Sequence, residues 1–184
     1  IDLVSRATVK PARDELVDVY HAVVEGVKIY FLHHPSIGRE VYQQSRGSSI
    51  EQIEQAILLS RGALEVMRMF DIVPDFIVGN DWTTGPVFAY LKAHPRYKDD
   101  PRFKNARFGY KIHNLGRIFQ GRFYTIEHGK DLFPLFDLGG EHYPGMANRA
   151  GAHPHHPARI NLARTGIYHS HFRQFVSRDY GVES

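Results

Sequence analysis

Polar residues with chemical potential follow two apolar stretches of this sequence. The stretch "DFIVGN" leads through Asn80 into Asp81 and Trp82, and "ARFGYKIHN" ends in His113 and Asn114. Carboxylate and imidazole groups hydrogen-bond polyhydroxyl ligands, and an indole ring can stack on a sugar or a base. In open α/β sheets, ligands bind beyond the carboxyl ends of the strands. If the two stretches are neighbouring strands, their last residues therefore form one site.

Each of these residues also has a purely structural interpretation. Asp81 could cap the helix that follows it, because aspartate is a favoured N-cap residue. Trp82, the single tryptophan of the chain, could belong to the hydrophobic core. His113 could be a structural histidine with satisfied hydrogen bonds. Residue types and spacing leave both interpretations open.

Periodicity and turn residues predict the elements that would position this site. Residues 16–34 hold two apolar, β-branched runs around Glu25 and Gly26, which predicts a β-hairpin. Residues 48–70 keep helical spacing behind Ser48 or Ser49 as a cap. Residues 75–80 are predicted to form a parallel strand that is buried on both faces. A helix over residues 83–94, with Pro86 in its first turn, follows it.

The second half of the chain repeats the alternation of strand and helix. Residues 94–105 are predicted as a charged loop, and residues 106–114 as the next strand. Residues 138–157, rich in Gly, Pro and His, predict a long surface loop. A helix over residues 160–171 and a last strand from residue 172 complete the pattern. The order predicts an α/β fold, a parallel sheet with right-handed crossovers. The first ten residues give no clear prediction.

The composition limits the classes of function. With 184 residues, 42% of them hydrophobic, the chain can bury one sizeable core, which predicts one domain. A net charge of +3 without a basic run does not indicate a nucleic-acid partner. The absence of cysteine excludes disulfides and thiolate chemistry and fits a reducing compartment. No apolar run approaches the roughly 18 residues of a spanning helix, so no membrane partner is expected. Since the chain begins with Ile1 and not with Met, we expect a piece of a longer protein.

The histidine-rich segment invites a metal interpretation. His153, His155 and His156 alternate with prolines there. A specific metal site needs imidazoles held in fixed orientation by further hydrogen bonds. Since a loop of this composition is more typical of a solvated surface, we predict no metal site. The chain also has no glycine-rich phosphate loop of either standard pattern and no serine nucleophile elbow.

Four segments together resemble the starch and glycogen synthase family. "PDFIVGNDWTTGPVFAYLK" is similar to the family's segment around Asn/His-Asp-Trp and the helix behind it. "DPRFKNARFGYKIHNLGRIFQGRF" is similar to its segments Asp-Pro-Phe-Phe-Lys-Asn and Ile-His-Asn-Leu. "GVKIYFLHHPSIGREVY" and "NLARTGIYHSHFRQFVSRDY" resemble an earlier and a later segment. The resemblance runs from about Val17 to Tyr180 in the family's order.

The resemblance implies a fold and a reaction. The fold is a Rossmann-like parallel sheet flanked by helices, the N-terminal half of a glycosyltransferase-B architecture whose active site lies between two domains. Residues 1–184 would be the N-terminal, acceptor-side domain without its first strand and without the C-terminal domain. The family transfers glucose from ADP-glucose or UDP-glucose to the non-reducing end of an α-1,4-glucan, retaining configuration, without metal or cofactor. The implied partners are the nucleotide sugar, the glucan and the C-terminal domain. The implied location is the cytoplasm, or a plastid in a plant.

The resemblance also assigns the site residue by residue. It places Asp81 and His113 as catalytic residues near the donor glucose and the acceptor, with the His113 ring able to donate a hydrogen bond to a glucose hydroxyl. The residues that it assigns to substrate binding are Asn114, Trp82, Tyr42, Gln120 and Gly121.

The sequence departs from the family pattern at several points, and alternatives stay open. Thr83 stands where the family has a histidine, Phe119 where it prefers tyrosine, and the family's early Lys-x-Gly-Gly-Leu loop is absent. One alternative is a non-catalytic carbohydrate-binding or interaction domain, which Thr83 favours slightly. Another is a related transferase with a different sugar acceptor. In either enzyme interpretation, half of a cleft is not expected to elongate glucan by itself.

Overall fold

The computed structural model describes residues 2–10, 15–37, 48–116, 119–148 and 159–176. An antiparallel sheet of three strands opens the chain: β1 (Asp2–Val9), β2 (Glu15–Val24) and β3 (Val27–His33). The predicted hairpin is confirmed, since β2 pairs with β3 and the turn residues Glu25 and Gly26 have φ angles of 51° and 81°. Two positive φ angles are typical of the tight turns that join such strands. The sequence did not predict β1, which pairs with β2 through an irregular register.

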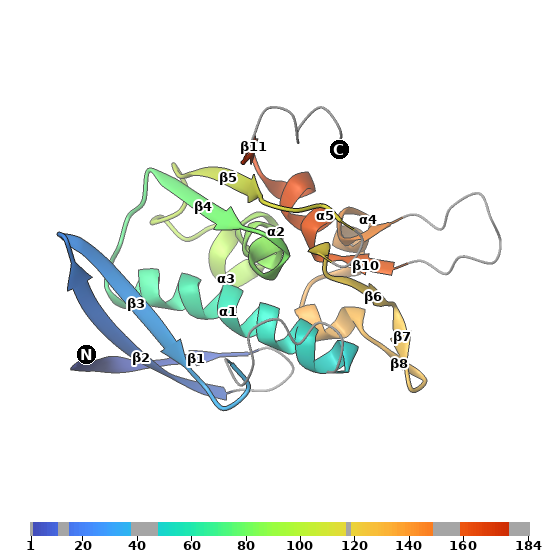
Figure 1. The fold of residues 1–184 in the computed structure, drawn as a ribbon, viewed down its shortest axis with the longest axis horizontal. Helices are drawn as coiled ribbons and strands as arrows, with labels where there is room; N and C mark the ends of the chain where they lie inside the picture. The colour runs from blue at the N-terminus through green and yellow to red at the C-terminus, as the bar shows by residue number, and fades with distance from the viewer. Residues whose placement is uncertain (1, 11–14, 38–47, 117–118, 149–158, 177–184) are drawn as a thin grey trace.

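The helix α1 (Ser49–Met69) joins the two halves of the fold. Ser48 caps it as predicted: the Ser48 hydroxyl accepts the Glu51 N–H, and the Glu51 side chain accepts the Ser48 N–H. One side of α1 buries Leu58 and Val66 against the antiparallel sheet, and the other sides contribute to the main core. Figure 1 shows α1 running between the blue β1–β3 sheet and the green helix α2.

The predicted parallel sheet is confirmed. It has the order β11-β5-β4, with β4 (Phe76–Asn80), β5 (Arg107–Ile112) and β11 (Phe172–Phe175) all parallel. The helices α2 (Gly85–Ala93) and α5 (Leu162–His169) pack on one face, where Phe88 contacts the rings of Phe108 and Tyr110. The chain thus has the α/β architecture that the alternation of strands and helices predicted.

The prediction that residues 75–80 are buried on both faces is wrong. Ile77 is 6% exposed, but Phe76 and Val78 on the other face are 64% and 49% exposed. The strand β4 is one of the two outer strands of its sheet, and the helices of the described residues cover only the face that carries Ile77. Apolar residues at successive positions predicted burial, but burial depends on which elements cover each face.

Two predicted loops contain short helices. Residues 94–105 include α3 (Pro95–Lys98), and Tyr97 and Phe103 are buried there. Residues 138–148 include the 3₁₀ helix η4 (Gly140–His142) and α4 (Tyr143–Met146), and Met146 is fully buried. The rest of the second loop, with its three histidines, lies outside the described residues. One helical turn has no periodicity that a sequence pattern can reveal, which explains both errors.

The remaining described elements are short. They are η1 (Trp82–Thr84), η3 (Phe133–Phe136), and the strands β6 (Arg122–Tyr124), β7 (Ile126–Glu127), β8 (Lys130–Asp131), β9 (Ala147–Asn148) and β10 (Arg159–Asn161). The predicted last helix and last strand are confirmed as α5 and β11. In the part of the chain that the structure describes, no helix is both long and apolar enough to cross a bilayer.

Candidate functional site

Asp81 and His113 lie side by side at the carboxyl edge of the parallel sheet. Asn80 pairs with Lys111 at the end of the β4–β5 ladder, and the next N–H, that of Asp81, donates to the Lys111 carbonyl at 3.0 Å. The Asp81 carboxylate then accepts the backbone N–H of His113 at 2.9 Å. Figure 1 shows the arrowheads of β4 and β5 pointing to this same edge. The predicted convergence of the two strand ends is therefore confirmed.

Asp81 does not act as a side-chain cap. Its carboxylate makes no capping hydrogen bond to η1, because it is directed at His113 instead. The Asp81 backbone has φ 57° and ψ −179°, a region that residues other than glycine rarely occupy. Its carbonyl accepts hydrogen bonds from the N–H and the hydroxyl of Thr84, at 3.2 and 3.0 Å. The surrounding contacts thus hold a strained backbone, at a cost of about 1–3 kcal/mol.

Trp82 packs partly into the core. Its ring meets the ring of Phe123 edge-on, with 6.0 Å between centroids. Gly121, at φ 58°, lies against the indole so closely that a Cβ atom there would come within 2.6 Å of it. These contacts with Gly121 and Phe123 agree with the interpretation of Trp82 as a residue of the hydrophobic core.

Gln120 and Gly121 connect the segment after β5 to the start of α5. Their carbonyl groups accept the N–H groups of Ala163 and Leu162 at 3.0 and 3.1 Å. The Gln120 side chain donates to the Leu115 carbonyl at 2.5 Å and accepts from Asn161 at 3.0 Å. Both residues therefore position the backbone beside the site.

Of the other residues that the sequence assigned to a site, only Asn114 lies in the part of the chain that the structure describes. Asn114 is exposed, and its side-chain oxygen accepts the Gly116 N–H at 2.7 Å. Tyr42 lies outside the described residues, as do His153, His155 and His156. No group of metal-ligating side chains that could hold an ion occurs among the residues that are described.

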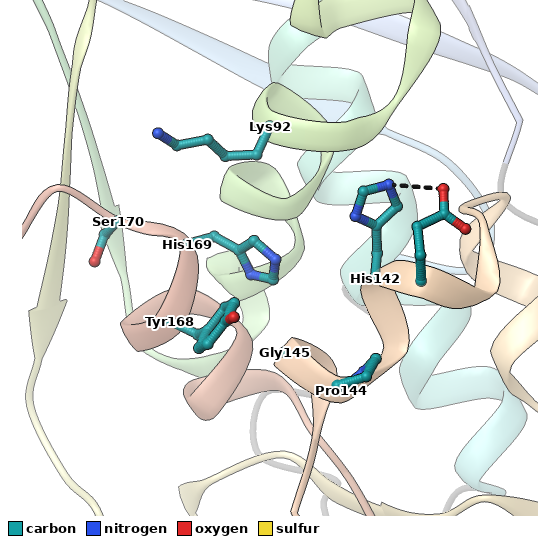
Figure 2. Close-up of a pocket in the computed structure, with 8 residues that line it drawn as sticks. Lys92, His142, Pro144, Gly145, Tyr168, His169 and Ser170 are labelled. Carbon is teal, nitrogen blue, oxygen red and sulfur yellow. Dashed lines mark ion pairs between the residues drawn. The ribbon is translucent and has the colours of Figure 1, made fainter.

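A separate hollow of about 320 Å³ lies between the ends of α2 and α5 and the segment around α4 (Figure 2). His142 of η4 and His169 of α5 face this hollow. Nε2 of His142 lies 3.3 Å from the Glu141 carboxylate. Burial lowers the pKa of His169, whose Nδ1 lies 2.9 Å from the Thr165 carbonyl. Lys92 stands in the last turn of α2, where the helix dipole favours a positive charge. None of the predicted site residues lines this hollow.

Comparison with protein families shows the family to which the chain belongs. The family model described as the starch synthase catalytic domain matches residues 2–183. The chain belongs to this family.

Two similar proteins are bacterial glycogen synthases. The chain is 34% identical to the glycogen synthase of Thermotoga maritima over 176 residues. This aligned region covers 92% of this chain and 32% of that protein. The chain is 29% identical to glycogen synthase 1 of Geobacter sulfurreducens over 159 residues. This aligned region covers 85% of this chain and 29% of that protein. The chain thus spans about a third of the length of these starch synthase family members.

A solved structure supports the fold assignment. The catalytic domain of starch synthase IV from Arabidopsis thaliana, bound to ADP and acarbose, superposes with a TM-score of 0.71. The match covers 98% of this chain and 34% of that chain, at 20% identity. This similarity supports the glycosyltransferase-B fold that the resemblance implied, since the structural neighbour has that fold.

Sequence reasoning named Asn80 at the end of its strand but assigned no role to it. Asn80 is the last residue of β4, and its side-chain oxygen lies 3.2 Å from Nε2 of His113. The asparagine is visible in the sequence directly before Asp81, but its contact depends on the register between β4 and β5. That register is not readable from either strand alone.

Proposed function

We propose that the protein to which this chain belongs transfers glucose from a nucleotide sugar to the non-reducing end of an α-1,4-glucan, with retention of configuration. The supporting observation is the hydrogen bond of 2.9 Å from the His113 backbone N–H to the Asp81 carboxylate at the carboxyl edge of the sheet. It occurs in a member of the starch synthase family. ADP-glucose and UDP-glucose are both candidate donors. ADP bound to starch synthase IV supports the first.

The geometry suits stabilisation of a developing positive charge. The His113 backbone is fixed by the Asp81 carboxylate, so the nearby carbonyl groups and the exposed imidazole keep their directions. Fixed dipoles of this kind stabilise charge that appears in the transition state, here at the anomeric carbon. Asn114, Trp82, Tyr42, Gln120 and Gly121 are proposed to contact or shape the substrate site.

We propose further that residues 1–184 form most of an N-terminal, acceptor-side domain. The strand β4 is an edge strand, and its apolar residues Phe76 and Val78 are exposed. Both features favour the proposal that further elements of a longer protein cover this strand. A C-terminal domain of the same protein would supply the other wall of the cleft. Transfer needs donor and acceptor held together, so the isolated chain is expected to be inactive.

The experiment is a transfer assay on the full-length protein. Labelled ADP-glucose and UDP-glucose are each supplied with a maltooligosaccharide primer, and labelled glucan is measured. His113→Ala tests the site, and His33→Ala, at an exposed histidine of β3, is the matched control. Glucan binding without transfer from either donor would favour a non-catalytic carbohydrate-binding domain, the alternative that Thr83 supports by replacing the family histidine. Transfer to a different sugar only would favour a related transferase.

No metal ion or other cofactor is proposed to take part. Exhaustive chelation of the full-length protein should leave the transfer rate unchanged. A rate that is lost on chelation and restored by one divalent ion would contradict this part of the proposal.

A further inference from the structure

The ring of His113 has one hydrogen-bond partner among the described residues. Its Nε2 lies 3.2 Å from the side-chain oxygen of Asn80, the last residue of β4. An amide oxygen only accepts hydrogen bonds. In the neutral ring, Nε2 therefore carries the hydrogen, and Nδ1 carries a lone pair.

The backbone beneath this ring is fixed from the same strand end. Asp81, next to Asn80, accepts the His113 N–H at 2.9 Å and donates its own N–H to Lys111 at 3.0 Å. Two consecutive residues, the last residue of β4 and the one that follows it, thus hold the ring and the backbone of His113. The Thr84 hydroxyl lies 3.0 Å from the carbonyl oxygens of both Asn80 and Asp81 and shares its hydrogen between them, which helps to fix the backbone of Asn80.

We propose that Asn80 is a positioning residue that holds His113 as the Nε2–H tautomer, with Nδ1 free to accept a hydrogen bond from a hydroxyl of the sugar substrate. The inference rests on the proposed transfer of glucose. It reverses the direction expected from the sequence, in which the imidazole donates. A hydroxyl that donates to Nδ1 keeps its own oxygen lone pairs available for other donors in the cleft.

The proposal assigns a defined role to each atom. Asn80 Oδ1 orients the ring, Nδ1 of His113 meets the substrate, and the Asp81 carboxylate sets the backbone. Both Asn80 and His113 are exposed in this chain, so water competes for their hydrogen bond. A ring that is already oriented loses less freedom when substrate binds, and misplaced groups lower the rate by up to about 100-fold.

The test uses the full-length protein with isotope-labelled histidine. Nitrogen NMR distinguishes a protonated from an unprotonated ring nitrogen and should show His113 with Nε2 protonated. Asn80→Leu removes the acceptor at similar size, and Asn80→Asp keeps an acceptor. Asn105→Leu, at an exposed turn position, is the matched control.

Asn80→Leu should give His113 a mixture of tautomers and lower kcat by about 10–100-fold, with a smaller change in KM. Its Tm should match that of Asn105→Leu, because both side chains are exposed. At a pH where the ring is neutral, Asn80→Asp should keep the tautomer and recover most of kcat.

Two results would overturn the inference: a native His113 protonated at Nδ1, or an Asn80→Leu protein with unchanged tautomer and kcat. The NMR measurement needs no turnover. If no nucleotide sugar supports transfer, the proposed function fails, while the tautomer still decides whether Asn80 orients the ring.

Discussion

The Asp81 carboxylate accepts the backbone N–H of His113 at 2.9 Å, while the Asp81 backbone stands at φ 57° and ψ −179°. The strained conformation and the hydrogen bond belong together. The Asp81 N–H stays with the Lys111 carbonyl, and the chain turns at once into η1, so the carboxylate is directed toward the end of β5. A backbone strain that is held by its surroundings is typical of functional sites.

Glycine at position 81 should separate this strain from function. Asp81→Gly removes a strain of about 1–3 kcal/mol but also loses a charged hydrogen bond that contributes about 1.5–3 kcal/mol. The two changes nearly cancel, so the Tm of the full-length protein should change little. Asp81→Ala loses the bond and keeps the strain, so it should be less stable than Asp81→Gly by roughly 1–2 kcal/mol after the greater flexibility of unfolded glycine is allowed for. Thermal melting of both variants measures the difference.

Both Asp81 variants should lose activity. Without the carboxylate, the His113 backbone is no longer fixed, and kcat should fall by on the order of 10²–10³. Asp99, exposed and at φ −107°, is the matched control position. There alanine should be at least as stable as glycine, and kcat should not change. If alanine is favoured over glycine at position 81 by as much as at position 99, the strain at Asp81 is not energetically significant.

Replacement of His113 by alanine should affect turnover rather than folding. The side chain is exposed, so its loss should leave Tm nearly unchanged. Loss of a group that stabilises transition-state charge lowers kcat by on the order of 10²–10³, or about 2.7–4 kcal/mol. Measuring kcat and Tm on one preparation decides between the roles. A destabilised protein with full turnover per folded molecule would identify His113 as a packing residue.

The sequence was sufficient for features that depend on local patterns. The capping box and periodicity of α1 and the apolar runs of β4 and β5 predicted their elements, and polar residues at two strand ends predicted one site. Features that depend on tertiary arrangement were not predictable. The exposure of Phe76 follows from what covers β4, and the contact of Asn80 with His113 follows from strand register. The positive φ of Asp81 was hidden because aspartate at that position also suggests a helix cap.

Gly121 should be required for the packing of Trp82. A Cβ at Gly121 would lie 2.6 Å from the indole, and the residue has φ 58°. Gly129 has φ 76° with nothing within 4 Å of its Cβ position, so it is a matched control for the backbone alone. Gly129→Ala should cost about 1–2 kcal/mol. Gly121→Ala should cost a further 1–3 kcal/mol or so, because the indole must move. Equal losses of Tm in the two variants would show that Trp82 yields without cost.

His94 should make stability depend on pH. Its Nδ1 accepts the Arg96 N–H at 3.1 Å and caps α3, and its Nε2 lies 3.4 Å from the Asp137 carboxylate. Burial, followed by the nearby Arg61 guanidinium, lowers the pKa of His94, and the weaker attraction to Asp137 does not offset this. The neutral ring is therefore the form that the folded protein prefers.

The sign of the pH effect follows from this lowered pKa. Between the folded pKa and the unfolded value of about 6.5, the unfolded chain binds more protons than the folded chain. The contribution of His94 to stability is therefore complete above about pH 6.5 and is lost as the pH falls through the folded pKa. Protonation of Nδ1 also removes the cap, which is typically worth about 1 kcal/mol.

Asparagine at position 94 should keep the cap without titrating, because it accepts the same N–H. In the full-length protein, His94→Asn should flatten the dependence of Tm on pH below about pH 6.5. The lost ring contacts with Tyr90 and Tyr97 should lower Tm by a similar amount at every pH. His33→Asn, at an exposed histidine of β3, is the control substitution. If the Tm of His94→Asn falls with pH as steeply as that of the unsubstituted protein, another group is responsible for the acid sensitivity.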